Sequence, residues 1–228
     1  MDADIKVEFV DCMGSDLTVV NAARVSFDKQ SYWEPDSPGL LKEQDSRLIT
    51  YLAEHGHWTP FSHPQVSLRL TVPIAIRNQL DKSRVGLAIN EVSRRYVSTS
   101  PKIYWPEWRS KPDGSIKQGS GDFIVEGLSD DAEQTYYMGI SSALTAYARL
   151  LDLGVAPEQA RFVLPLGMMT EFIWTGSIAA FARVYNLRSS PDAQYESRLV
   201  AEKIATIMKP LFPYSWDALT KKENTDDR

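Results

Sequence analysis

Residues Gln65-Val-Ser-Leu-Arg-Leu-Thr-Val72 carry an apolar side chain at every second position. Side chains on a strand point alternately to its two faces, so this spacing predicts a half-buried β-strand. Val66, Leu68, Leu70 and Val72 are expected on the buried face. The protein should therefore contain a β-sheet that packs on one side.

Toward the N-terminus, the pattern predicts one more strand and two helices. Residues 5–13 alternate and predict a first strand, and a helix starts at Leu17 after Gly14-Ser15-Asp16. Residues 28–39 carry two prolines and polar side chains, which predicts a loop. Residues 45–55 have the spacing of an amphipathic helix that stops at Gly56.

Toward the C-terminus the chain becomes helical. We expect helices over residues 129–154, 156–162, 170–186 and 193–208. This order predicts an α+β fold, with an antiparallel sheet and a largely helical C-terminal half. A single domain is expected over 1–219, with a long loop or insertion at 98–128 and a flexible tail at 220–228.

Composition excludes several classes of protein. The 228 residues carry a net charge of −5, with 43% hydrophobic and 24% charged residues, as in ordinary soluble domains. An acidic balance argues against broad nucleic-acid binding. The N-terminus lacks the features of a signal peptide, and no apolar run approaches the roughly 18 residues of a membrane span. We expect a cytoplasmic protein that binds neither nucleic acid nor membrane.

The single cysteine, Cys12, excludes an internal disulfide and any metal site built from several cysteines. It lies in the first predicted strand, so we expect a small buried thiol rather than a nucleophile.

The segment Lys82–Tyr96 concentrates positive charge in an acidic chain. It holds four cationic side chains, one carboxylate, one amide and two serines, and it reads as helical. Such a segment indicates contact with an anion. A basic helix of a non-catalytic nucleotide- or nucleic-acid-binding module is one alternative.

All three histidines lie within nine residues, at positions 55, 57 and 63. Zinc would need further ligands on a rigid element, and the His-Glu-x-x-His spacing is absent. We expect no metal site. A role at the helix end, or a ligand contact from the turn before the strand at 65–72, fits better.

Arg161 and Arg188 lie in apolar surroundings, in Ala160-Arg-Phe-Val-Leu-Pro165 and Asn186-Leu-Arg188. Each alone could form a structural ion pair. Together with Arg84 and Arg95 they favour a phosphorylated ligand, because guanidinium binds phosphate bidentately and stays charged when desolvated.

These motifs together resemble the flavin-dependent thymidylate synthase family. Its hallmark is Arg-His-Arg, a short spacer, then Asn-Glu-x-Ser-x-Arg-Tyr, and Asn90-Glu-Val-Ser-Arg-Arg-Tyr96 reproduces the second half. Further matches over about 170 residues are Ala23-Arg-Val-Ser-Phe27, His55 to His63, Gln79, Ala160 to Pro165, and Asn186 to Gln194. The resemblance implies that family's fold and makes residues 1–219 a catalytic domain.

The sequence departs from the family pattern at three places. Lys82-Ser-Arg84 replaces Arg-His-Arg, the spacer is one residue longer, and Asp192 stands where the family has histidine. These changes leave open a related activity, in which the same scaffold modifies another pyrimidine nucleotide or adds another one-carbon group.

The resemblance implies conversion of dUMP to dTMP. Methylenetetrahydrofolate would supply the carbon, FAD would be the cofactor, and NADPH would reduce it. The family's enzymes are homotetramers whose active sites are shared between subunits. Arg188 would act in catalysis, by stabilising negative charge on the uracil ring.

The resemblance also implies two sets of binding residues. The dUMP set is Gln79, Glu91, Ser93, Arg94, Arg95, Arg161 and Arg188. The FAD set is His57, Thr59, Lys82, Ser83, Arg84, Glu91, Ser177, Ile178, Ala179 and Arg183.

Overall fold

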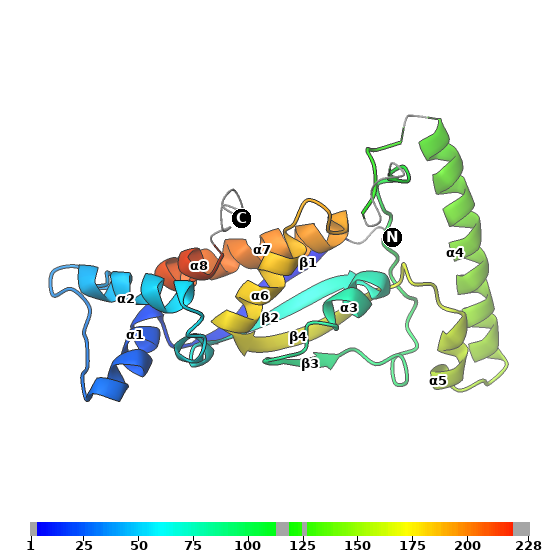
Figure 1. The fold of residues 1–228 in the computed structure, drawn as a ribbon. Coiled ribbons are helices and arrows are strands. Elements are labelled where there is room, and N and C mark those ends of the chain that lie inside the picture. The colour runs from blue at the N-terminus through cyan, green and yellow to red at the C-terminus, as the bar shows by residue number, and fades with distance from the viewer. Residues whose placement is uncertain (1–3, 113–118, 125–126, 221–228) are drawn as a thin grey trace.

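The computed structural model describes residues 4–112, 119–124 and 127–220 (Figure 1). Its centre is a four-stranded antiparallel sheet with the strand order β1-β2-β4-β3. The strands are β1 (Lys6–Met13), β2 (Gln65–Pro73), β3 (Leu87–Glu91) and β4 (Met169–Ser177). The α+β prediction, with a helical C-terminal half, is confirmed. Most of the predicted tail, residues 221–228, lies outside the described residues.

Strand β2 has the alternation that its sequence predicts. Val66, Leu68, Leu70 and Val72 are all fully buried. On the other face polar groups pair across the ladder: the Ser67 and Thr175 hydroxyl oxygens lie 2.8 Å apart, and Arg69 donates to Glu171 at 2.7 Å. Only one face of the sheet therefore packs against helices.

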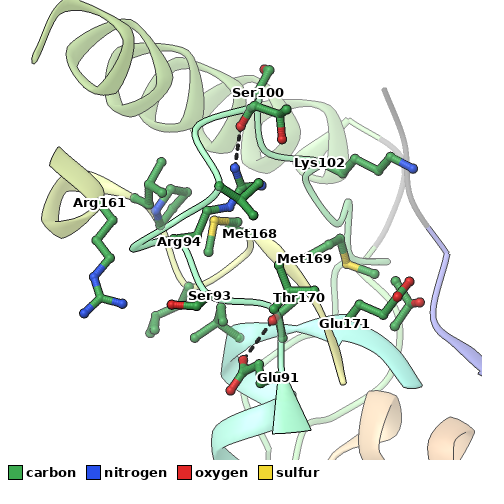
Figure 2. Close-up of a pocket in the computed structure, with 18 residues that line it drawn as sticks. Glu91, Ser93, Arg94, Ser100, Lys102, Arg161, Met168, Met169, Thr170 and Glu171 are labelled. Carbon is green, nitrogen blue, oxygen red and sulfur yellow. Dashed lines mark hydrogen bonds between the residues drawn. The ribbon is translucent and has the colours of Figure 1, made fainter. Parts of the chain in front are cut away.

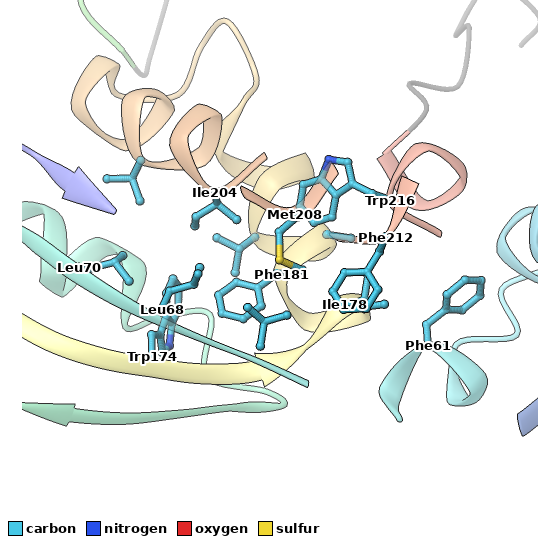
Figure 3. Close-up of a cluster of buried hydrophobic side chains, with 14 of the residues drawn as sticks. Phe61, Leu68, Leu70, Trp174, Ile178, Phe181, Ile204, Met208, Phe212 and Trp216 are labelled. Carbon is cyan, nitrogen blue, oxygen red and sulfur yellow. The ribbon is translucent and has the colours of Figure 1, made fainter. Parts of the chain in front are cut away.

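Two C-terminal helices, α6 (Ile178–Arg188) and α7 (Tyr195–Leu211), cover that face, and α8 (Pro213–Thr220) packs against them and against the N-terminal helices. Figure 3 shows Ile204 above Leu68 of the sheet, and the Phe181 ring centroid lies 5.6 Å from that of Trp174. Phe181, Ile204, Met208 and Phe212 are fully buried. Each such side chain contributes roughly 1.5–3 kcal/mol through burial. None of the helices in the described part of the chain is long and apolar enough to cross a membrane.

Four N-terminal elements pack at one end of the sheet, namely α1 (Asp16–Arg24), η1 (Val25–Phe27), α2 (Glu43–Glu54) and η2 (Thr59–Ser62) (Figure 1). The short helix α3 (Ile74–Leu80) follows β2 and lies at the other end of the sheet. Asp45 is fully buried, where it pairs with Arg24 and accepts from Ser31. The predicted helix at 45–55 is thus present as α2. Cys12 lies in β1 as expected, but partly rather than fully buried.

A long helix, α4 (Leu128–Asp152), stands at the opposite end of the molecule (Figure 1). It is followed by α5 (Pro157–Ala160) and η3 (Arg161–Val163). A second, small core of Ile103, Ile140 and Met168 joins this part to the sheet. The described residues of 98–127 contain no helix or named strand, although Ser110 and Ile124 donate backbone hydrogen bonds to Asp122 and Trp108.

Two predicted helical segments are wrong. Residues 82–96 form a turn followed by β3, and 170–177 belong to β4 before α6 begins. Both pair with distant strands, which satisfy their backbone groups. Gly86 adopts φ 76°, which breaks a helix, and its carbonyl approaches Gly176 so closely that a Cβ there would lie 2.6 Å away.

Candidate functional site

The first candidate site is a cavity of about 700 Å³ at the junction of β3, β4 and η3 (Figure 2). It contains four residues of the predicted dUMP set, namely Glu91, Ser93, Arg94 and Arg161. Lys102 of the loop after β3 adds a further cation to its lining. Cations, a hydroxyl and the backbone of a turn can together bind a phosphate group.

Glu91 has both carboxylate oxygens occupied. Thr170 donates to one at 2.8 Å, and an Arg77 guanidinium nitrogen lies 2.6 Å from the other. Figure 2 shows the Glu91 side chain turned toward Thr170. In this chain Glu91 thus holds β3 and β4 together at the edge of the cavity.

Arg95 lies beside this cavity rather than in its lining. Its Nε is 3.3 Å from a Glu158 carboxylate oxygen, and its Cζ lies 5.5 Å from the Tyr96 ring centroid. Arg161 also contacts Glu158, since its Nε donates to the Glu158 backbone carbonyl at 3.2 Å. The Glu158 carboxylate therefore pairs with the guanidinium of Arg95, which the sequence predicts to bind phosphate.

A second cavity, of about 750 Å³, lies where α3 meets α6 and the loop before α7. It contains Gln79 and Arg188, two of the three predicted dUMP residues that the first cavity lacks. Arg188 donates to the Gln79 carbonyl at 2.9 Å, and burial lowers the pKa of its guanidinium from the ordinary value. Ser197 of α7 donates to the Gln79 side chain. Arg188 is thus a fixed, partly desolvated cation.

The same cavity includes Arg109, which the sequence analysis missed. One Arg109 nitrogen lies 2.8 and 3.0 Å from the two carboxylate oxygens of Glu196, and its Cζ is 4.7 Å from the Tyr195 ring centroid. Its Nε donates to the Ser120 hydroxyl at 2.8 Å. Its position after Trp108, an arginine beside aromatic residues, could have identified it.

The first half of Lys82–Tyr96, with Lys82 and Arg84, lies in the turn between α3 and β3. Arg84 pairs with Asp81, and this hydrogen bond is the main reason that the pKa of the Asp81 carboxyl falls below its ordinary value. Lys82 is exposed, whereas Ser83 is buried. The turn packs on α6, because Arg183 donates to the Val85 carbonyl.

The remaining residues of the predicted FAD set lie near this turn or at η2. Ser177 caps α6 by accepting from the Ala180 amide at 3.2 Å, and the Ile178 side chain is fully buried in the core. The Ile178 amide donates to the Pro64 carbonyl, just after η2. His57, just before η2, and Thr59, at its start, are both exposed. Ala179 is partly buried. Ile178 could therefore contact a ligand only through its backbone.

Exposed cations suit an anionic cofactor at this surface. Lys82, Arg84 and Arg183 are all exposed, and they surround one turn. This donor set fits the pyrophosphate of a dinucleotide. Ser83 contributes neither charge nor an aromatic face.

One of the three histidines, His55, lies at the end of a helix. The His55 ring stacks on Tyr51 with centroids 4.0 Å apart, and its Nδ1 lies 2.9 Å from the Tyr51 carbonyl at the end of α2. Among the residues that the structure describes, no three His, Cys, Asp or Glu side chains gather as a metal site would require.

Within one chain the structure does not unite the predicted dUMP residues. The linings of the two cavities have no residue in common. Glu91, Ser93, Arg94 and Arg161 belong to the first cavity, and Gln79 and Arg188 to the second.

Comparison with known proteins gives consistent matches along the chain. Residues 8–214 match the family model described as thymidylate synthase complementing protein. The chain is 37% identical to a flavin-dependent thymidylate synthase of Kosmotoga olearia, over 97% of this chain and 92% of that one. It is 34% identical to that of Thermus thermophilus, over 93% and 74%.

Solved structures agree with these matches. A UMP/dUMP methylase from Streptomyces cacaoi bound with 5-Br dUMP superposes with a TM-score of 0.83, at 29% identity over 96% of both chains. The same methylase bound with 5-Br UMP gives a TM-score of 0.79 at 28% identity, over 96% of this chain and 94% of that chain.

Proposed function

We propose that this chain, which belongs to the flavin-dependent thymidylate synthase family, converts dUMP to dTMP. Membership makes the protein an FAD-dependent methyltransferase. In this reaction methylenetetrahydrofolate would donate the carbon and NADPH would be the reductant. Residues 1–219 would form one catalytic domain.

The placement of Arg188 is the observation that carries this proposal. Its guanidinium is partly desolvated and held by the Gln79 carbonyl in a polar cavity. A fixed cation there would stabilise negative charge on the uracil ring, which makes the ring carbon nucleophilic. One such preorganised interaction is worth several kcal/mol.

The phosphate of the nucleotide would bind in the first cavity. Ser93, Arg94 and Arg161 line it, and Arg95 lies at its edge. Arginine and hydroxyl donors suit a dianionic phosphate better than a neutral nucleoside.

Two half-sites on one chain support an active site shared between subunits of a homotetramer. Ser93 and Arg161 of one subunit would complete the cavity that holds Arg188 of the partner subunit. The side chains of Phe162 (79% exposed) and Leu166 (63% exposed) lie on or beside the first cavity. Large exposed apolar side chains next to a site suit a subunit interface.

The cofactor would be held by Lys82, Arg84 and Arg183 through its phosphates, with His57 and Thr59 at the adjacent η2 surface. Bound flavin supplies the reducing equivalents that convert the transferred one-carbon unit into a methyl group. Ser177 and Ala179, at the start of α6, would approach it through their backbone or small side chains.

UMP is the second candidate substrate. The Streptomyces cacaoi protein with a similar structure is described as a UMP/dUMP methylase. The chain departs from the family pattern at Lys82-Ser-Arg84, in the longer spacer before Asn90, and at Asp192.

The test is product analysis by mass spectrometry. Purified protein is incubated with methylenetetrahydrofolate and NADPH, and with dUMP or UMP in parallel. The proposal expects dUMP to gain the mass of one CH2 unit. No gain on dUMP would overturn it, and a gain on UMP alone would establish the second candidate. Arg188→Ala should abolish the gain while the protein keeps its flavin absorbance.

A further inference from the structure

Arg77, in the middle of α3, lies between two carboxylates from different segments. One guanidinium nitrogen is 3.3 Å from Asp81 at the end of the same helix, and the other is 2.6 Å from Glu91 at the end of β3. The three side chains are only 20%, 15% and 22% exposed. Ion pairs this sheltered are screened much less than surface pairs.

These contacts form a chain of alternating charge. Arg84 pairs with Asp81, Asp81 with Arg77, and Arg77 with Glu91. Two cations therefore face two anions, and Thr170 occupies the remaining oxygen of Glu91. Each member has a partner that fixes its position.

This series of ion pairs joins the two halves of the Lys82–Tyr96 segment. Arg84 belongs to the cationic turn, and Glu91 precedes Ser93 and Arg94 of the first cavity. The Arg77 guanidinium links the turn to the end of β3 through side chains, because its planar fork reaches both carboxylates at once.

The helix that carries Arg77 also borders both cavities. Ile74, at its start, lines the first cavity, and Gln79, near its end, lines the second and accepts from Arg188. A shift of α3 would thus displace the backbone carbonyl that holds Arg188.

We infer that Arg77 is a positioning residue, which sets the placement of the cofactor turn, the nucleotide loop and Arg188 relative to one another. It acts through Asp81, Glu91 and α3 and touches no ligand itself. This inference rests on the proposed function, because the ligands it names are FAD and dUMP.

The experiment compares Arg77→Met and Arg77→Lys with the unaltered protein. In Arg77→Met the new side chain is unbranched and apolar and has no charge. Because it can pair with neither carboxylate, we expect at least a tenfold higher Kd for both FAD and dUMP. Arg77→Lys keeps the charge, but a single ammonium can hold only one carboxylate. It should raise both constants about threefold and so partly rescue the methionine variant.

A readout at saturation separates positioning from lost stability. Destabilisation lowers the fraction of folded protein, but it does not alter the spectrum of a saturated folded site. We expect the change in bound-flavin absorbance on addition of dUMP to differ between Arg77→Met and the unaltered protein with both sites filled. If Arg77→Met does not fold, Arg77→Lys decides the question by the same measurements.

Arg47→Met is the matched control, since it breaks an exposed Arg47–Glu43 pair on α2. It should leave both Kd values and the spectrum unchanged. Unaltered Kd values and spectra in both Arg77 variants would overturn this inference and leave the proposed function standing. Unaltered protein that binds neither FAD nor dUMP would overturn the proposed function, and the inference with it.

Discussion

At the scale of single residues, the partner of each arginine decides whether its charge is available to a ligand. Arg84 pairs with Asp81, Arg95 with Glu158 and Arg109 with Glu196. Arg188 instead binds a backbone carbonyl and has no carboxylate partner among the described residues. A neutral acceptor leaves its full charge available to a ligand, which suits the catalytic role proposed for it.

Glu158 competes with the nucleotide phosphate for Arg95 in this proposal. The pair is about half exposed, and such pairs are worth roughly 0–1 kcal/mol. Glu158→Gln should therefore tighten dUMP binding by about two- to fivefold. Arg95→Ala should weaken it about tenfold, and calorimetric titration measures both.

The double variant is the control for this prediction. With Arg95 replaced by alanine, the added Glu158→Gln change should bring no tightening, because no guanidinium remains to be released. Tightening in the double variant would show that Glu158 acts in another way.

At the scale of elements, α8 depends on a residue far away in the chain. Asp16, in the first turn of α1, accepts from the Tyr214 amide at 3.1 Å and the Ser215 amide at 2.9 Å, and also from the Ser215 hydroxyl. It thereby caps α8 from outside that helix, as an N-cap side chain would. Burial raises the pKa of the Asp16 carboxyl above its ordinary value, although these hydrogen bonds oppose the shift.

Asp16→Ala should lower the free energy of unfolding by about 2 kcal/mol, because it leaves buried amides without an acceptor. Urea denaturation followed by circular dichroism measures this change.

Asp16→Asn tests the pH dependence. A raised pKa means that the folded protein binds the Asp16 proton more tightly than the unfolded chain does. The Asp16 contribution is therefore fully present below the ordinary aspartate pKa of about 4, and it falls as pH rises through the folded-state pKa. The difference in unfolding free energy between unaltered protein and Asp16→Asn should decline over that window. A difference that grows with pH would contradict the assignment.

At the scale of the whole molecule, the sheet separates two kinds of surface. The helices α6 and α7 bury one face, with α8 packed against them, and α4 stands at the end of the molecule near the first cavity (Figure 1). Met138 and Tyr137 on α4 are each 54% exposed. This distribution suits an assembly in which further copies of the chain cover the remaining surfaces.

Subunit complementation tests whether the active sites are shared. Arg161→Ala damages the first cavity and Arg188→Ala the second, and each protein alone should be inactive. Mixed tetramers should regain activity in about a quarter of their sites, where an intact half from each chain meets. Co-expression with two affinity tags, followed by assay of the doubly tagged fraction, measures this. A mixture as inactive as its parents would place the whole site within one chain.

Local patterns determined much of this protein. The alternation of β2, the amphipathic α2, and the helices α4 and α7 follow from residues close in sequence, because helix and strand periodicity are local properties. The motif Asn90–Tyr96, together with the further matches over about 170 residues, indicates the family. The helix predicted over residues 82–96 is wrong, since residues 87–91 form β3.

Only the tertiary structure decided the rest. Residues 87–91 and 170–177 are strands because their hydrogen-bond partners lie on strands distant in sequence, which local propensity does not encode. The same holds for the two cavities: nothing in the spacing of Arg161 and Arg188 reveals that they line different ones. Arg77 and Arg109 gain their roles solely from carboxylates brought to them by folding.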